Sequence, residues 1–82
     1  MFRVYVLRNE SGRGYIGLSE DVEKRLRQHN AGLSNWTAKF RPWELQWTSV
    51  ELSLRDARKL ESKMKGQKGG DGLDRLMREF GA

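Results

Sequence analysis

The stretch from Tyr15 to His29 constrains the fold most, because it runs from a strand end through a glycine and a serine into an amphipathic helix. Ser19 is expected to cap this helix, and two acidic residues in the first turn complement the helix dipole. The helix should end near His29, because the next segment, Asn30-Ala31-Gly32, is typical of a helix C-terminus. A strand that leads directly into a helix is therefore the organising unit of the chain.

The helix carries two polar residues on its apolar face. With about 100° per residue, one face collects Val22, Arg25, Leu26 and His29. An inward arginine and histidine are costly unless a partner or a ligand satisfies them. Periodicity alone favours the simpler interpretation, in which Arg25 lies at the edge of the stripe and His29 finds a partner at the helix end. The preceding residues, Tyr15-Ile16-Gly17, favour a functional role instead.

Length and composition exclude several classes of protein. Eighty-two residues suit one small domain with a modest core, expected to span residues 1–82. There are no cysteines, and one histidine cannot build a multi-histidine zinc site, although a hard cation held by oxygen remains open. The longest apolar run, Val4-Tyr5-Val6-Leu7, is too short to cross a membrane, and the N-terminus has no signal-peptide apolar region. We therefore expect a soluble, cytoplasmic protein.

The positive charge is unevenly distributed along the chain. The formal net charge is +5, and residues 55–68 hold six basic residues against two acidic ones. Such clustering favours a polyanionic partner, nucleic acid ahead of an anionic membrane surface, although a merely solvated helix face fits the charge equally well. The basic residues expected to contact nucleic acid are Arg27, Lys39, Arg58, Lys59, Lys63, Lys65 and Lys68.

The first two strands are expected to form a hairpin. Residues 2–7 are rich in β-formers and alternate in direction, so Tyr5 should face away from Val4 and Val6. Turn residues then allow Tyr15-Ile16-Gly17 to return antiparallel. This hairpin would bring Tyr5 close to Tyr15.

The middle of the chain is expected to hold a short helix and a third strand. Residues 34–39, which include Trp36 and Thr37, suit a short helix. Residues 45–51 then alternate, with Leu45 and Trp47 expected on one face of the strand.

Two further helices are expected after the third strand. Ser53 opens a capping box, and its helix should run to about Lys65. Glu61 falls in the apolar arc of this helix, where a carboxylate is more often an edge residue paired with a neighbouring arginine. A glycine-rich, mobile loop is expected at 67–72, followed by a packing helix at about 72–80.

Five polar residues from separate segments need an explanation: Tyr5, Tyr15, Arg25, His29 and Glu61. They are expected around one hollow over the sheet. Phosphodiester hydrolysis requires a base that activates water, a cation beside the phosphoryl oxygens and a metal that stabilises the leaving oxygen. The simpler interpretation treats the two tyrosines as a cross-strand aromatic pair. It leaves the convergence of three segments unexplained.

The chemistry of these groups limits how they act. With its ordinary pKa of about 10, Tyr5 is a poor base at neutral pH unless positive charge from Arg25 and His29 lowers that pKa. A single carboxylate such as Glu61 binds Mg²⁺ weakly, because the ion keeps several waters and expects phosphate oxygens to complete its shell. A metal is therefore expected to arrive largely with the nucleic acid.

These motifs together resemble the GIY-YIG nuclease domain, and more closely the small single-domain bacterial members of that family. Arg3-Val4-Tyr5 stands where the family has Gly-Ile-Tyr, and Tyr15-Ile16-Gly17 is the second signature as written. The middle segment at 36–45 is also similar, so the resemblance covers residues 2–68. The single residues that match the family's positions are Arg25, His29 and Glu61.

The resemblance implies an α+β fold, in which helices flank a three-stranded antiparallel sheet in the order β-β-α-β-α-α. It implies a metal-dependent endonuclease that hydrolyses DNA phosphodiester bonds, an activity of the kind used in DNA repair or recombination. One Mg²⁺ or Mn²⁺ would bind together with the DNA. So short a chain has little surface for base readout, so a protein partner could supply the specificity for particular DNA substrates.

By the same resemblance, Tyr5 would be the general base or water-orienting group and Arg25 the phosphate clamp. Tyr15 and His29 would support them, and Glu61 would be the metal ligand. Two rival interpretations use the same residues: a catalytically silent DNA-binding module and a basic, RNA-associated structural protein. Retention of all five polar residues favours the nuclease.

Overall fold

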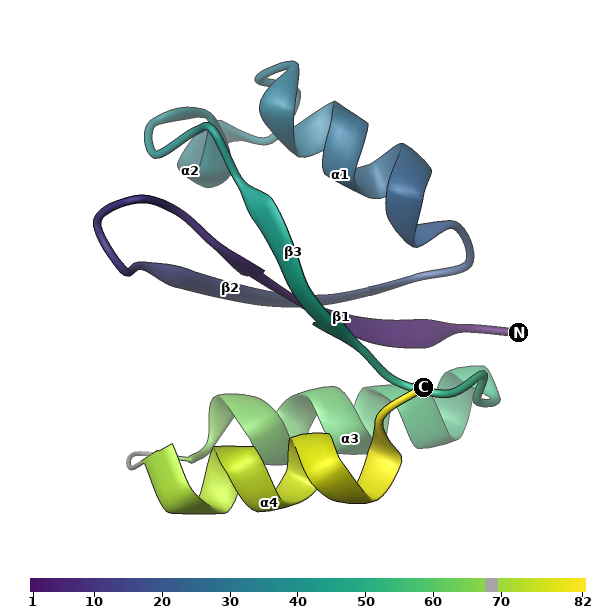
Figure 1. The fold of residues 1–82 in the computed structure, drawn as a ribbon. Coiled ribbons are helices and arrows are strands. Elements are labelled where there is room, and N and C mark those ends of the chain that lie inside the picture. Colours follow the sequence, from purple (N-terminus) through teal and green to yellow (C-terminus); the bar gives the residue numbers. More distant parts are fainter. Residues whose placement is uncertain (68–69) are drawn as a thin grey trace.

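A three-stranded sheet lies between two layers of helices in the computed structural model, which describes residues 1–67 and 70–82 (Figure 1). Helices α1 and α2 cover one face, and α3 and α4 cover the other. This confirms the expected α+β class and order, with the short helix expected at 34–39 present as α2. The elements are β1 (Arg3–Arg8), β2 (Gly14–Ser19), α1 (Val22–Asn30), α2 (Asn35–Ala38), β3 (Glu44–Thr48), α3 (Leu54–Lys65) and α4 (Gly70–Phe80).

Strand β1 is the centre of the sheet, which has the order β2-β1-β3 with antiparallel pairing throughout. Its side chains alternate between two cores. Val4 and Val6 pack with α3, whereas Tyr5 and Leu7 pack on the α1 side. The predicted alternation is therefore confirmed, and all four residues are buried because β1 is covered on both faces.

Helix α1 begins two residues later than expected. Asp21, not Ser19, is its N-cap, and the Asp21 carboxylate accepts a hydrogen bond from the backbone N–H of Lys24 at 3.1 Å. Ser19 is instead the last residue of β2, and its hydroxyl oxygen accepts from the Asp21 N–H at 3.0 Å. Either residue type can cap a helix, and the strand pairing of Ser19 with Arg3 decides between them.

Strand β3 ends earlier than expected because a buried serine takes over its hydrogen bonds. The Ser49 hydroxyl accepts from the backbone N–H of Val4 at 2.9 Å and donates to the Val50 carbonyl at 2.8 Å. A register shift opposite Val6 and Leu7 also separates two residues expected on one face. Trp47 pairs with Val6 on the α3 side, whereas Leu45 pairs with Leu7 and is 40% exposed.

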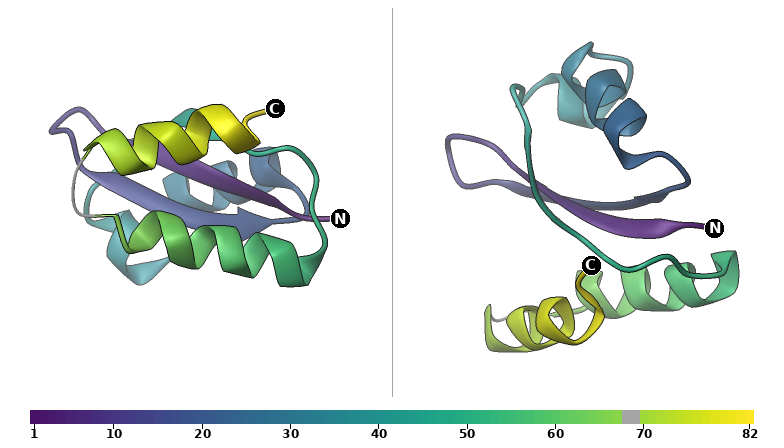
Figure 2. Two further views of the ribbon diagram at one scale, coloured as in Figure 1. Left: turned by 90° about the horizontal axis from the view of Figure 1, so that it is seen from below. Right: turned by 45° about the vertical axis from the view of Figure 1, so that its right-hand side comes forward.

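Helices α3 and α4 lie side by side under the sheet (Figure 2). The cap of α3 is as predicted, since the Ser53 hydroxyl accepts from the Asp56 N–H at 3.1 Å and the helix ends at Gly66. Helix α4 starts at Gly70, so residues 70–72 are helical where a loop was expected. The rest of that expected loop lies partly outside the described residues. None of the described helices is long and apolar enough to cross a membrane.

Candidate active site

The hairpin places the Tyr5 side chain directly over a glycine. Tyr5 pairs with Gly17 across β1 and β2. A Cβ atom at Gly17 would lie 2.6 Å from the Tyr5 hydroxyl oxygen and 2.7 Å from its ring carbon Cζ. These distances are far below van der Waals contact, so any larger side chain would displace the tyrosine. The glycine of Tyr15-Ile16-Gly17 thus makes room for the Tyr5 hydroxyl.

Three buried residues form a chain of hydrogen bonds that starts at Tyr5. The Tyr5 hydroxyl lies 2.9 Å from His29 Nε2, and His29 Nδ1 lies 2.8 Å from the Thr37 hydroxyl oxygen. The Thr37 hydroxyl donates to the Ser34 carbonyl at 3.3 Å. Tyr5, His29 and Thr37 are at most 1% exposed, so each polar group depends on these partners.

The contacts of Thr37 are compatible with a His29 tautomer that accepts from Tyr5. Thr37 can donate its one proton to the Ser34 carbonyl, which also accepts from the Ala38 N–H at 2.9 Å, and its oxygen then accepts from His29 Nδ1–H. In the neutral imidazole Nε2 is in that case an acceptor, and Tyr5 O–H donates to it. We assign this tautomer to His29 because the opposite one would deny the buried Tyr5 proton this acceptor.

The electrostatics of the site correct the expected behaviour of Tyr5. Burial, and then the nearby Tyr15, raise the pKa of Tyr5 to about 12, although Arg25 acts in the opposite direction. Burial, and then Arg25, lower the pKa of His29 below its ordinary 6.5. His29 is thus neutral at pH 7 and supplies no positive charge. Arg25 acts to lower the pKa of Tyr5 as expected, but desolvation outweighs it and the neutral His29 adds no positive charge, so the pKa of Tyr5 is raised overall.

Tyr15 joins the same cluster from the edge strand. Its ring centroid lies 6.2 Å from that of Tyr5 and 4.8 Å from that of His29, the latter in an edge-on arrangement. The expected proximity of the two tyrosines is therefore confirmed. Unlike Tyr5, Tyr15 is half-buried and lines an open cavity beside Trp36. Tyr15 is thus the more accessible of the two hydroxyl-bearing rings.

Arg25 reaches the site from the inward face of α1. Its guanidinium is close enough to Tyr5 to lower the tyrosine pKa, and Nη1 donates to Gln28 Oε1 at 3.0 Å. The arginine is half-buried and lines a hollow with Phe2 and Lys24. Arg25 and Tyr15 therefore border different hollows, so the expectation that all five polar residues surround one hollow is wrong.

Glu61 approaches from the opposite face of the sheet, on α3. Its charge raises the pKa of Tyr5, which places it within electrostatic reach of the hydroxyl at the β2 edge. Its carboxylate pairs with Lys65 Nζ at 3.3 Å, one turn along α3, and its side chain is 22% exposed. Glu61 is thus an edge residue with a basic partner, which is a lysine where an arginine was expected. Its carboxylate is nevertheless accessible to a ligand.

The donor set suits a metal held weakly. Among the residues that the structure describes, no group of three histidine, aspartate or glutamate side chains could enclose an ion. Glu61 has a partly exposed carboxylate, and its charge acts to raise the pKa of Tyr5. One carboxylate, with waters and substrate phosphate oxygens as the other ligands, fits the way Mg²⁺ is bound at phosphate-transfer sites.

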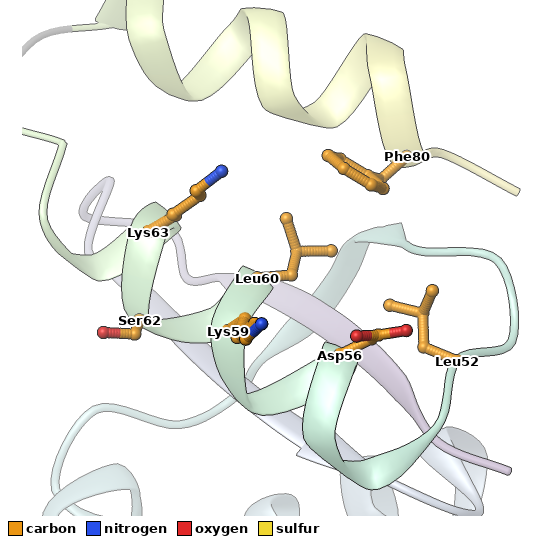
Figure 3. Close-up of a pocket in the computed structure, with 7 residues that line it drawn as sticks. All are labelled: Leu52, Asp56, Lys59, Leu60, Ser62, Lys63 and Phe80. Carbon is orange, nitrogen blue, oxygen red and sulfur yellow. The ribbon is translucent and has the colours of Figure 1, made fainter.

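The basic residues of α3 point in two directions. At about 100° per residue, Lys65 lies about 40° from Glu61 around the helix, whereas Lys59 and Lys63 lie about 160° away. Lys59 and Lys63 instead line a hollow of about 460 Å³ between α3 and α4, whose apolar floor includes Leu60 and Phe80 (Figure 3). The predicted contact residues on α3 therefore do not form a single surface.

The remaining predicted contact residues are also exposed: Arg27 on α1, Lys39 just after α2 and Arg58 on α3. Lys68 lies outside the described residues. Sequence reasoning gave no role to Thr37, which orients His29, or to Asn30, which binds both backbone groups of Trp43 at 2.7 and 3.0 Å. Both act through single contacts between segments, and such contacts leave no periodic signal in the sequence.

Comparison with known proteins identifies the family. The family model described as the GIY-YIG catalytic domain matches residues 1–73. The chain therefore belongs to the GIY-YIG nuclease family, and the predicted class of protein is confirmed. No solved structure matches the chain closely enough to be compared with it.

Two curated relatives are similar over part of the chain. Both are named structure-specific endonuclease subunit SLX1, from strains JEC21 and B-3501A of Cryptococcus neoformans var. neoformans serotype D. Each is 40% identical over 52 residues, which cover 55% of this chain but 11% of the relative. Because these relatives are fungal, the closer resemblance to small bacterial members stays an expectation.

Proposed function

We propose that the protein is a metal-dependent endonuclease that hydrolyses DNA phosphodiester bonds. The observation that carries the proposal is the buried chain Tyr5–His29–Thr37, which leaves a tyrosine hydroxyl bonded to a neutral imidazole beside Arg25. An imidazole nitrogen held 2.9 Å from a tyrosine hydroxyl is the arrangement that a proton relay requires.

The proposed reaction uses Tyr5 as a relay. A water molecule attacks the phosphorus atom and gives its proton to the Tyr5 oxygen, while the Tyr5 proton passes to His29 Nε2 over 2.9 Å. This transfer avoids a free tyrosinate, which a pKa of about 12 makes scarce at neutral pH. The P–O bond to the leaving sugar oxygen breaks, and that oxygen takes a proton from solvent. His29 then returns its proton to the Tyr5 oxygen as Tyr5 releases to solvent the proton it took from the attacking water, which restores both groups.

Access to Tyr5 sets a condition on this reaction. The residue is 1% exposed, so the attacking water must reach its hydroxyl past Arg25 or Tyr15, the partly exposed neighbours. Arg25 would bind the phosphoryl oxygens, where its fixed charge stabilises the charge that develops in the transition state. Tyr15 would hold the imidazole through its edge-on contact.

Glu61 would hold one Mg²⁺ or Mn²⁺ ion. When bound, such an ion stabilises negative charge on the leaving oxygen. Without an ion, the Lys65 ammonium neutralises the Glu61 carboxylate, which reduces its repulsion of DNA phosphates. We propose DNA as the substrate because the net charge of +5 favours a polyanion and the named relatives are structure-specific endonuclease subunits. A protein partner follows from the same name, since those relatives are subunits.

The test separates binding from cleavage. Purified protein is incubated with plasmid, branched DNA and RNA in Mg²⁺ or Mn²⁺, and compared with Glu61→Gln. The matched control is Asp56→Asn, which removes the same charge from an exposed position on the same helix. We expect Glu61→Gln to abolish cleavage while DNA affinity in EDTA holds or rises, and Asp56→Asn to cut normally.

Other outcomes would redirect the proposal. Wild-type cleavage by Glu61→Gln would show that its carboxylate does not hold the metal. Loss of DNA binding in a folded Glu61→Gln protein would make Glu61 a structural partner of Lys65. Binding without cleavage of any substrate would favour the silent DNA-binding module, and preference for RNA would favour the RNA-associated alternative.

A further inference from the structure

Trp36 is an exposed aromatic side chain that the proposed reaction does not use. It is 44% exposed, in contrast to Trp43, which is 2% exposed and donates its indole N–H to the Thr37 carbonyl at 2.8 Å. The Trp36 ring packs on Phe40 and Trp43, with centroid distances of 4.9 and 5.9 Å. Neighbouring rings therefore support it while a large part of its surface faces solvent.

The Trp36 ring is also nearly parallel to the ring of Tyr15, a residue of the candidate active site. The Trp36 and Tyr15 centroids lie 6.1 Å apart with an angle of 28° between the ring planes. Tyr15 in turn contacts His29, with centroids 4.8 Å apart. A flat ligand on Trp36 would consequently lie one residue away from the proposed proton relay.

The space beside Trp36 combines aromatic, apolar and cationic walls. A cavity of about 420 Å³ is lined by Trp36 and Tyr15 from one side of the sheet and by Met64 and Lys65 from α3. Lys65 also pairs with Glu61, so one wall of the cavity contacts the proposed metal ligand. Flat apolar walls next to an ammonium group complement a nucleobase joined to a phosphate.

We propose that Trp36 is a stacking platform for one unpaired nucleobase of the substrate, next to the phosphodiester that is cut. Lys65 would contact the phosphate of the same nucleotide. This inference rests on the proposed function and deepens it, because it names the substrate class as DNA with a single-stranded segment. In an intact duplex both faces of a base are already stacked on neighbours, so only a splayed or unpaired base can offer a face to Trp36.

Removing the ring should weaken binding by an amount typical of base stacking, about 5- to 150-fold in affinity for one base. The loss should appear on DNA with a flap or gap and be absent on a blunt duplex. The dependence of affinity on salt should stay unchanged, because stacking neutralises no phosphate. Lys65→Ala, in contrast, should reduce the slope of log affinity against log salt by about one.

The test scans an abasic nucleotide across the junction of a flapped DNA, with binding measured by fluorescence anisotropy in EDTA. Wild type should lose affinity at one position, and Trp36→Leu should show no loss there. Trp36→Phe should keep part of the effect, since it retains a ring. Leucine preserves apolar packing on Phe40, and thermal melting checks that each variant is folded. The control is Leu33→Ala, an exposed residue of the same region at 71%, which should match wild type.

Each result decides the inference. The inference is overturned if removing a base costs wild type and Trp36→Leu the same affinity at every position. It is also overturned if Trp36→Leu loses as much affinity for blunt duplex as for flapped DNA. Because the assay needs neither metal nor cleavage, it is independent of the nuclease proposal. If the protein cuts DNA but its abasic-site penalty does not depend on Trp36, the stacking platform alone is refuted. If the penalty depends on Trp36 but the protein cuts no DNA, the nuclease proposal alone is refuted.

Discussion

The two faces of strand β1 differ in chemistry although they share one backbone. Toward α3 the strand presents Val4 and Val6 to an aliphatic core that contains Leu60 and Met64. Toward α1 it presents Tyr5, which bonds to His29 in a cluster rich in rings and hydroxyls. The first face can contribute only packing, whereas the second holds buried polar groups that the fold must satisfy. Aliphatic packing and the proposed proton relay are therefore divided between the faces of a single strand, whereas the proposed metal ligand Glu61 comes from α3.

The largest effect on cleavage is expected when the α1 side of β1 loses the hydroxyl oxygen of Tyr5. Tyr5→Phe keeps the ring over Gly17 but removes the group that passes a proton to His29. Cleavage should fall by about 10²- to 10⁴-fold, the usual contribution of general acid–base catalysis. The unfolding free energy should fall by about 1–3 kcal/mol, because His29 Nε2 loses its buried partner. Single-turnover cleavage and urea unfolding measure the two quantities. Wild-type cleavage by a folded Tyr5→Phe protein would remove Tyr5 from the reaction.

The aliphatic face should respond in the opposite way. Leu60→Ala deletes buried methyl groups from the core under β1 and should cost about 2–5 kcal/mol of unfolding free energy. That is a large part of the total expected for a small domain, about 5–15 kcal/mol. Cleavage per folded molecule should stay near wild type, because Leu60 belongs to the core cluster of Val4 and Val6 and not to that of Tyr5. A loss of activity in the folded fraction would show that the two faces are coupled.

The positioning role of Thr37 can be separated from its packing role. Thr37→Val keeps the shape but cannot accept from His29 Nδ1–H, so the imidazole loses its preference for the productive tautomer. We expect about a tenfold decrease in cleavage, equal to about 1.4 kcal/mol. Thr37→Ser should restore the rate because it restores the hydroxyl. If valine and serine variants behaved alike, the side chain would act through packing only.

The lowered pKa of His29 predicts how pH affects both cleavage and stability. The unfolded chain protonates this histidine near its ordinary 6.5, whereas the folded chain protonates it only at lower pH. Between these values the unfolded state binds more protons, so stability rises with pH there and is lost as pH falls below about 6.5. Cleavage should fall only at lower pH, as the pH passes the lowered pKa of His29 in the folded chain, because a protonated His29 cannot accept from Tyr5. In His29→Gln this part of the pH dependence of unfolding should vanish; if it persists, other groups cause it.

The smallest effect concerns the basic residues of α3. Lys65→Ala removes a charge beside Glu61 and should lower DNA affinity and reduce the salt slope by about one. Lys59→Ala and Lys63→Ala remove equal charges from the groove beside α4 and serve as matched controls, with smaller changes expected. Anisotropy titrations at several salt concentrations measure both quantities. Equal slopes for all three variants would mean that DNA follows the whole of α3.

Much of the fold was predictable because it depends on local chemistry. The alternation of β1, the capping box at Ser53 and the stop at Gly32 all appear where the sequence places them. Gly32 adopts φ 81°, which a glycine accepts without strain. The predicted helix boundaries were wrong where the local sequence fits two alternatives equally well. Ser19 and Asp21 are both good caps, and residues 70–72 extend α4 despite two glycines.

The sequence by itself determined the family, the three strands and which residues carry polar chemistry, since these depend on residue type and spacing along one segment. The tertiary structure alone decided how those residues interact. It buried Tyr5 enough to raise its pKa, brought the Thr37 hydroxyl against the imidazole of His29, and set the helix of Glu61 on the opposite side of the sheet from α1. Burial and hydrogen-bond direction depend on atoms from distant segments meeting in space. No spacing along the chain encodes them.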